Sequence, residues 1–184
     1  MANTTPTELL LLASRSGGTK TLVRALWAGA DIEDKELDGR TAAMWAASHG
    51  NAECLSLLIE AGADLEAKDS NGRTVSMFAA RAGEAQCLSL LIKAGADLEA
   101  KDPSGRTASM FAARDGNAEC LSLLIKAGVD VEAKDSNGRT VAMWAASFGN
   151  AECQRMIETE IERRTIAGEI SVPSTAKQRP SLRV

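Results

Sequence analysis

Four cysteines are the first residues in this 184-residue chain whose type and spacing could do chemistry. Regularly spaced thiolates can bind zinc, close disulfides or act as nucleophiles. The spacing here is a constant 33 residues, at Cys54, Cys87, Cys120 and Cys153. If each cysteine holds the same place in a stacked helical unit, neighbours lie ~8–10 Å apart. That separation exceeds the ~7 Å limit for a disulfide and cannot close a tetrahedral zinc site. We therefore expect four buried apolar thiols, no metal and a reducing compartment.

Other catalytic constellations are absent from the sequence. His49 is the single histidine, and no cysteine–histidine nucleophile pair suggests itself. The phosphate-binding pattern Gly-x-x-x-x-Gly-Lys does not occur. Acidic residues recur at the repeat spacing, which places them on ridges rather than in a pocket. We expect neither an enzyme nor a cofactor-binding protein.

Arginines are the sharpest candidates for binding chemistry. The sequence Gly-Arg-Thr-x-x-Met-(Trp/Phe)-Ala-Ala occurs four times, at 39–47, 72–80, 105–113 and 138–146. Two roles are open for its arginines. They could make bidentate contacts to the carboxylates of an acidic partner segment. Alternatively, they could pair within the chain with the neighbouring aspartates Asp38, Asp69, Asp102 and Asp135.

The 33-residue period predicts the elements that position these residues. In one unit, Asp69-Ser70-Asn71-Gly72 has the composition of a turn, and Thr74 is placed to cap a helix through about Arg81. Gly83 ends that helix, and a second one follows over about 84–94. Two helices per unit, repeated without strands, predict an all-α solenoid of helix-turn-helix units with hairpin loops.

The same signals divide the chain into intervals. We expect a disordered start over 1–4, a divergent first repeat at 5–37, and near-identical repeats at 38–70, 71–103 and 104–136. The fifth repeat, 137–169, lacks its glycine stop, so its second helix should run on toward Gly168 and present a polar outer face. Residues 170–184 form a basic tail containing Pro and Ser, a composition typical of disorder.

These features resemble the ankyrin-repeat family over residues 5–169. The resemblance rests on the period, the two helices, the Gly-Ala-Asp after the second helix and the Ala-Lys-Asp leading to Gly-x-Thr. It implies an L-shaped stack with a concave face of short helices and hairpin loops, and a convex back of second helices. It also implies protein binding and only rarely catalysis. Where the family has Thr-Pro-Leu-His, this chain has Thr-x-x-Met followed by Trp or Phe, an exchange of volume between core positions.

The resemblance also places several candidate residues at variable, partner-contacting positions. The loop arginines and the arginines that end the first helices would form a basic stripe on the concave face. His49 and Phe148 would put a ring at each end of it, although Phe148 could instead pack on the extended last helix. The predicted partner-binding set is Arg40, His49, Arg73, Arg81, Arg106, Arg114, Arg139 and Phe148.

A second candidate surface lies in the first repeat. Four consecutive leucines, 9–12, surround a helix, so at least one must face outward. Trp27 takes the place that Glu60, Lys93 and Lys126 hold in later repeats, which should face solvent. Leu9, Leu12 and Trp27 therefore form either a docking patch or ordinary N-terminal capping.

Composition narrows the remaining possibilities. A net charge of −4 argues against nucleic-acid binding. The apolar run of residues 9–13 is too short to span a membrane, and Glu8 before it is unlike a signal peptide. We expect a cytoplasmic scaffold or adaptor that binds an acidic segment of another protein. The main alternative is a structural subunit anchored by the Leu/Trp patch and the tail. An enzyme inhibitor, suggested by size alone, and a nucleic-acid binder are weaker alternatives.

Overall fold

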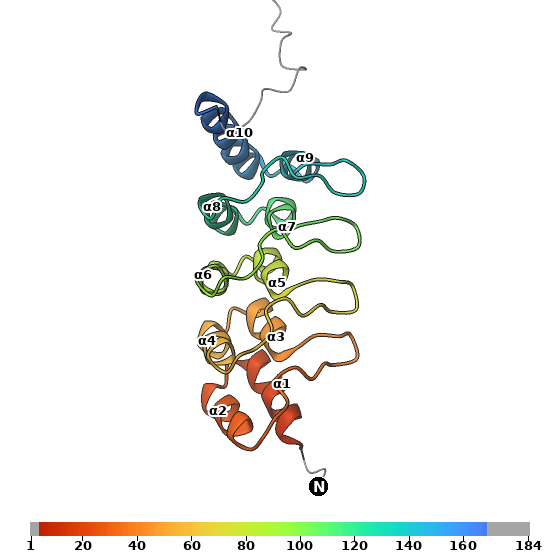
Figure 1. Ribbon diagram of the computed structural model, residues 1–184, viewed down its shortest axis with the longest axis vertical. Coiled ribbons are helices and arrows are strands. Elements are labelled where there is room, and N and C mark those ends of the chain that lie inside the picture. Colours follow the sequence, from red (N-terminus) through yellow and green to blue (C-terminus); the bar gives the residue numbers. More distant parts are fainter. Residues whose placement is uncertain (1–3, 169–184) are drawn as a thin grey trace, which may run out of the picture.

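A computed structural model describes residues 4–168 of the chain, and over that range it contains ten α-helices and no strand (Figure 1). The predicted all-α solenoid is confirmed. The helices form five pairs: α1 (Pro6–Ser16) and α2 (Thr19–Trp27), α3 (Ala42–Ser48) and α4 (Ala52–Glu60), α5 (Val75–Ala82) and α6 (Ala85–Lys93), α7 (Ala108–Asp115) and α8 (Ala118–Lys126), and α9 (Val141–Ser147) and α10 (Ala151–Ile166). Most of the expected disordered start, and the basic tail, lie outside the described residues.

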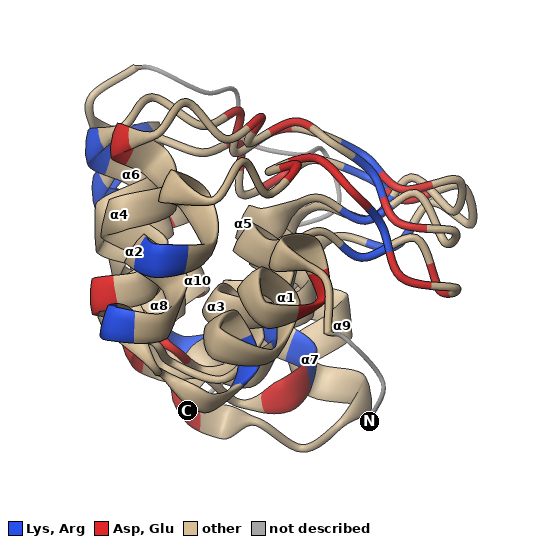
Figure 2. Ribbon diagram, turned by 90° about the horizontal axis from the view of Figure 1, so that it is seen from below, with Lys and Arg blue, Asp and Glu red and all other residues tan. Residues whose placement is uncertain are grey.

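The pairs stack into two columns (Figure 1). The odd-numbered helices form one column and the even-numbered helices the other. The hairpin loops project from the first column, away from the second, and the end view in Figure 2 shows this L-shaped profile. Neighbouring odd-numbered helices pack on one another along the whole stack. The concave face is therefore built from the odd-numbered helices and the loops that precede them.

Local sequence signals set most helix ends. At α1 the Glu8 amide donates to the Thr5 hydroxyl at 3.2 Å, and the Glu8 carboxylate accepts the Thr5 amide at 2.7 Å. This is the predicted capping box. Gly83 follows α5 with a φ of 80°, a left-handed conformation that residues with a Cβ rarely adopt.

The threonine caps of the other odd-numbered helices divide into two kinds. Thr41 and Thr140 accept the amide three residues on, at 3.5 and 3.4 Å. Thr74 is the N-cap residue of its helix, as predicted, but its hydroxyl makes no such bond. Thr107 behaves the same way, and its hydroxyl lies 2.8 Å from that of Ser109. Both non-capping repeats carry serine two residues after the threonine, where the capping repeats carry alanine, so a local hydroxyl accompanies the loss of the cap.

Hydrogen bonds between successive loops are interrupted once. The Ser70 amide donates to the Asp38 carbonyl at 3.1 Å, and the Ser136 amide donates to the Ser104 carbonyl at 2.9 Å. Pro103 holds the matching place in the loop between them. Because proline has no N–H, this link cannot form there.

The core is built mainly from Ala, Leu, Val, Met and Cys, and Phe78, Phe111 and Trp144 are its aromatic members. Met44, Met77 and Met110 fill equivalent places and are each 1% exposed. Met143, in the last described repeat, is 54% exposed, since the described residues contain no further repeat to cover it. Close packing between units therefore depends on a neighbour at each side.

The last helix continues beyond its siblings, as predicted. α10 has 16 residues, where α8 has 9. The extension is held against the preceding repeat by Arg164, whose Nη1 donates to the Val129 carbonyl at 3.0 Å. Glu160 accepts hydrogen bonds from both Arg163 and Arg164. Charged residues thus occupy the end of the stack.

Candidate functional site

Each loop arginine covers the aromatic ring five residues further along the chain. The distances from the guanidinium carbon to the ring centroid are 4.4 Å for Arg40 and Trp45, 4.7 Å for Arg73 and Phe78, 4.9 Å for Arg106 and Phe111, and 3.8 Å for Arg139 and Trp144. These are cation–π distances. Sequence reasoning assigned the arginine and the ring to separate roles and missed this contact. The available signal was that both types recur together in all four copies.

Three of these arginines are also held by carboxylates inside the chain. The ion pairs join Arg73 to Asp69 at 2.6 Å, Arg106 to Asp102 at 2.6 Å and Arg139 to Asp135 at 2.9 Å. The aspartate side chains are 0% exposed in each pair. Of the two roles open from sequence, pairing within the chain is therefore present at these loops. Figure 2 shows the resulting rows of basic and acidic residues along the projecting loops.

Hydrogen bonding lowers the pKa of two of these aspartates, Asp69 and Asp135. Burial raises the pKa of Asp69, but hydrogen bonds from the side chain and amide of Arg73 outweigh it, and the net pKa is lowered. The pKa of Asp135 is lowered for the same reasons, by the Arg139 and Asn137 amides and the Arg139 side chain. These carboxylates stay charged and keep their arginines in place.

The second repeat departs from this arrangement. Glu36 lies one period of 33 residues before Asp69 and takes the place of the buried aspartate. Its longer side chain accepts hydrogen bonds from Arg15 Nη2 at 2.7 and 2.8 Å. The Nε of Arg40 lies 3.0 Å from a carboxylate oxygen of Asp38, which is close enough for an ion pair. The geometry is not that of a hydrogen bond, so this buried N–H has no hydrogen-bond acceptor. Within the described residues, no side-chain hydrogen bond of Arg40 is present.

A hollow of about 310 Å³ opens beside Arg40 on the concave face, between α3 and α5. Its lining residues are Arg40, Ser48, His49, Phe78, Arg81 and Ala82. Three of the predicted partner-binding residues, Arg40, His49 and Arg81, therefore come together at one place. None of the six lining residues is acidic.

Arg81 is the unpaired cation of this hollow. It is exposed, and in the described part of the chain its side chain makes neither a hydrogen bond nor an ion pair. Burial of part of the side chain, and then the positive charges of Arg114 and Arg73, lower the pKa of Arg81, and only the more weakly acting Asp115 opposes them. Arg81 therefore sits in a field of like charge without a carboxylate of its own.

Arg114, one repeat further on, contrasts with Arg81. It donates from Nε and Nη2 to the two oxygens of Asp115, both at 2.8 Å. The pKa of Arg114 is raised by this hydrogen bonding, which outweighs burial. Ala82 stands where Asp115 stands one period earlier, so the neutralising acid is missing beside Arg81.

Two exposed rings lie on the concave face, one in the second repeat and one in the last. The His49 ring is 5.5 Å from that of Trp45, and its Nδ1 lies 3.1 Å from the Trp45 carbonyl oxygen. Phe148 holds the corresponding place in the last repeat and is 57% exposed. Its ring stacks on that of Trp144 at 5.9 Å. Each of these two repeats therefore presents a ring supported by a tryptophan.

The four cysteines are free and buried. Burial, assisted by Glu84, raises the pKa of Cys87 to about 11. Burial, assisted most by Glu119, raises the pKa of Cys120 to about 12. Thiols with such pKa values are protonated at neutral pH and are poor nucleophiles. They pack as small apolar side chains.

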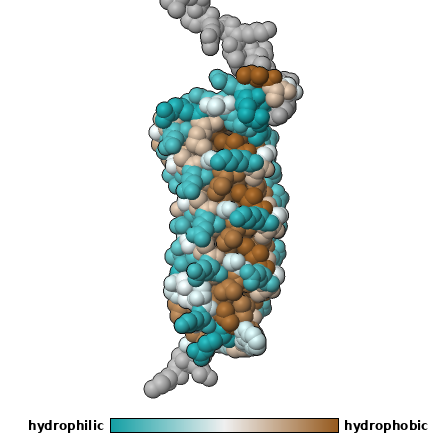
Figure 3. Space-filling view, turned by 90° about the vertical axis from the view of Figure 1, so that its left-hand side faces the viewer, coloured by the Kyte–Doolittle hydropathy of each residue, from teal (hydrophilic) through white to brown (hydrophobic). Residues whose placement is uncertain are grey.

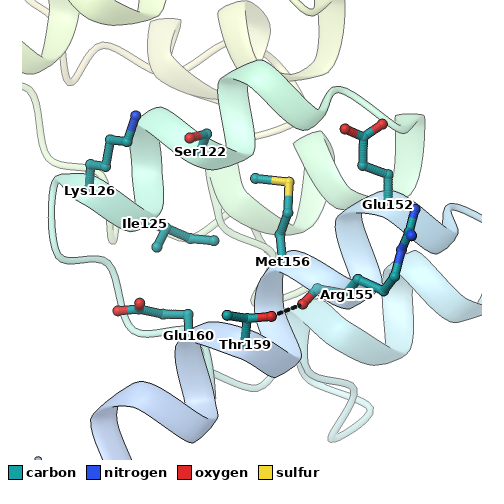
Figure 4. Close-up of a pocket in the computed structure, with 8 residues that line it drawn as sticks. All are labelled: Ser122, Ile125, Lys126, Glu152, Arg155, Met156, Thr159 and Glu160. Atoms are coloured by element: carbon teal, nitrogen blue, oxygen red, sulfur yellow. Dashed lines mark hydrogen bonds between the residues drawn. The ribbon is translucent and has the colours of Figure 1, made fainter.

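A larger hollow of about 540 Å³ lies between α8 and α10 (Figure 4). Figure 4 shows Ile125 and Met156 between the two helices, with Lys126, Glu152 and Glu160 around them. None of the predicted partner-binding residues lines it. Charges of both signs surround its apolar floor, so it lacks the single-sign character of the concave hollow.

The second predicted patch is spread over two helices. Leu12 on α1 and Trp27 on α2 are both exposed, and Trp27 reaches 88%. Leu9 is partly buried and lines a separate hollow with Arg24 and Ala28, which neither of the other two residues lines. Figure 3 shows the face of the even-numbered helices, where apolar side chains form a stripe interrupted by polar ones. Partly buried leucines and isoleucines of this column include Leu57, Ile59, Leu90, Ile92, Leu123 and Ile125.

Comparison with known proteins agrees with the architecture. The family model for ankyrin repeats in three copies matches residues 10–102 and 77–163. A comparison with curated protein sequences finds no significant match. Among the helices of residues 4–168, none has the length and apolar character needed to cross a membrane. Ankyrin repeats generally mediate protein–protein interaction. With the family model covering most of the chain, and helix pairs and hairpin loops stacked in register, this chain belongs to the ankyrin-repeat family.

Proposed function

We propose that this chain is a non-catalytic interaction module, a scaffold or adaptor, that binds an acidic segment of another protein on its concave face and loop tips. The observation that carries the proposal is the acid-free hollow between α3 and α5, where Arg81 has no partner inside the chain. An unpaired guanidinium in a concave site suits a carboxylate from outside, which it can bind through two parallel hydrogen bonds.

The predicted binding residues differ in how many hydrogen-bond donors they have left for a partner. Arg73, Arg106 and Arg139 are held by buried aspartates, so they offer a partner only their outer edges. Arg114 is neutralised by Asp115. Arg40 and Arg81 retain donors for a partner. His49 and Phe148 supply exposed rings in the second and the last repeat, and interface hot spots favour aromatic residues and arginine.

The proposal is tested by affinity purification of the tagged chain from the cells that produce it, in three forms. These are the natural sequence, Arg81→Glu and Lys93→Glu. The two variants make the same charge change, one in the concave hollow and one on the exposed back of α6. Proteins recovered with the natural sequence and Lys93→Glu, but lost with Arg81→Glu, are concave-face partners. We expect their binding segments, mapped by peptide arrays, to be acidic.

Recovery of the same proteins with all three forms would contradict the site assignment. Circular dichroism of each variant checks that the helices remain formed. We do not expect either variant to unfold, because neither side chain has a partner inside the described chain and exposed substitutions usually change stability by about 0.5 kcal/mol or less.

A further inference from the structure

The hollow at the junction of the second and third repeats offers more hydrogen-bond donors than a single carboxylate needs. The two Nη groups of Arg40 and the whole guanidinium of Arg81 have no hydrogen-bond acceptor in the described part of the chain, whereas the Arg40 Nε is buried beside Asp38. Ser48 and His49 line the same space, but the Ser48 hydroxyl already donates to the Trp45 carbonyl at 3.1 Å, and the His49 Nδ1 lies 3.0 Å from that hydroxyl, so the spare donors are those of the two arginines. The donors come from two repeats and face one cavity of about 310 Å³.

From this geometry we infer that the hollow binds a phosphorylated side chain carried by the acidic partner segment. The inference rests on the proposed function and specifies what the partner presents at this point. A phosphoserine or phosphothreonine supplies three acceptor oxygens and a charge of about −1.5 to −2, against two oxygens and one charge for a carboxylate. Arginine forks match phosphate geometry, and clusters of arginine are a common way to recognise phosphorylated peptides.

The charges around the hollow favour this ligand. Arg73 and Arg114 lie close enough to lower the pKa of Arg81. The acids in the neighbourhood are committed elsewhere: Asp69 to Arg73, and Asp115 to Arg114. Asp38 contacts Arg40 through Nε, on one edge of the guanidinium. The Nη groups of Arg40 and the whole of Arg81 remain for the ligand.

Neighbouring repeats lack the same combination. At the junction of the third and fourth repeats, Asp115 stands in the place of Ala82 and neutralises Arg114. At the next junction, Ser147 replaces the helix-end arginine. The chain therefore carries a single place of this kind among the described repeats, and the substitution that would neutralise it occurs naturally one repeat away.

The test measures fluorescence anisotropy with three otherwise identical peptide pools. Each pool is acidic in its flanking positions and has phosphoserine, glutamate or serine at the centre. The proteins are the natural chain, Ala82→Asp, Arg81→Ser and the control Lys93→Ser on the back of α6. Ala82→Asp copies the Arg114–Asp115 pair, and Arg81→Ser copies Ser48, so both should keep the fold. Thermal unfolding of each variant verifies this.

We expect the natural chain and Lys93→Ser to bind the phosphoserine pool at least tenfold more tightly than the glutamate pool. Both substitutions in the hollow should remove that preference. Equal binding of the phosphoserine and glutamate pools, lost in Arg81→Ser, would overturn the phosphate inference and leave the proposed function standing. Binding of no pool would overturn both. Inorganic phosphate is added as a competitor. If it displaces the phosphoserine peptides at a concentration as low as that of the peptides themselves, the inference is also overturned, because the hollow would then be a site for a free anion.

Discussion

At the scale of single residues, the repeated arginine is one part of a three-membered unit. Its guanidinium lies between a buried aspartate and the face of an aromatic ring, as Arg73 lies between Asp69 and Phe78. The buried carboxylate depends on its arginine, because an unpaired buried charge is costly. Arg81, eight residues along, has no such dependency. Of these two arginines on the concave face, Arg73 is therefore needed to neutralise a buried charge, and Arg81 is not.

This contrast predicts different stabilities for two matched substitutions. Arg73→Ala should lower the free energy of unfolding by about 2–3 kcal/mol, because Asp69 keeps only the bonds from the Asn71 and Arg73 backbone amides and a long one, at 3.4 Å, from Asn71 Nδ2. Arg81→Ala should change it by about 0.5 kcal/mol or less. Urea denaturation followed by circular dichroism measures both. Similar losses in the two variants would contradict the assigned roles.

At the scale of elements, asparagine side chains tie each helix pair to the one before. Asn117 Nδ2 donates to the carbonyls of Ala80 and Arg81, both at 2.9 Å. Asn51 and Asn150 make the same pair of bonds at their own junctions. Glu84 occupies this place in the third repeat, and a carboxylate cannot donate to carbonyls. The junction between α3 and α6 therefore lacks this tie.

Glu84→Asn should stabilise the chain. Two new hydrogen bonds, to the carbonyls of residues 47 and 48, are expected to raise the free energy of unfolding by about 1–2 kcal/mol. The reverse change, Asn117→Glu, provides the matched control and should lower it by at least as much. Thermal unfolding by calorimetry compares the two. A Glu84→Asn variant no more stable than the natural chain would show that the tie contributes nothing at this junction.

At the scale of the whole molecule, stability is the sum of repeats and the interfaces between them, and the ends are special. The last interface is open, as the exposure of Met143 shows. The extension of α10 is instead held by polar bonds around Glu160 and Arg164. Hydrogen bonding from Arg163, and then from Arg164, outweighs burial and lowers the pKa of Glu160 to about 2.

The lowered pKa of Glu160 predicts acid sensitivity. In the unfolded chain the pKa of a glutamate is about 4.3. Between that pH and about 2, therefore, the unfolded chain takes up a proton that the folded chain does not. Stability from this group is fully present above that range and is lost as pH falls through it. Asp69 and Asp135 act with the same sign. Glu160→Gln should therefore flatten the fall in melting temperature, measured from pH 6 to pH 2.

The control for this prediction is Glu162→Gln, an exposed position on the same helix. It should leave the pH profile unchanged. A Glu160→Gln profile that parallels the natural chain throughout would argue against a native-state role for this carboxylate.

The sequence by itself determined the architecture. The 33-residue period, the capping box at Thr5 and the missing stop before Gly168 were enough to predict five helix pairs and a long last helix. These are local signals, and most of them occur in several repeats, which strengthens the prediction from each one. The period also predicted that the cysteines lie on separate helices, and all four are free and buried.

Only the tertiary structure decided which arginines are free. Arg40 and Arg73 occupy the same place in their repeats, yet a glutamate in place of an aspartate sends the carboxylate at position 36 to Arg15 instead. Arg81 and Arg114 are likewise equivalent, and differ because alanine replaces the acid at position 82. Whether a guanidinium binds inward or outward depends on the reach of one side chain across a turn or between repeats. That reach depends on the distances between packed residues, which the 33-residue pattern of the sequence does not contain.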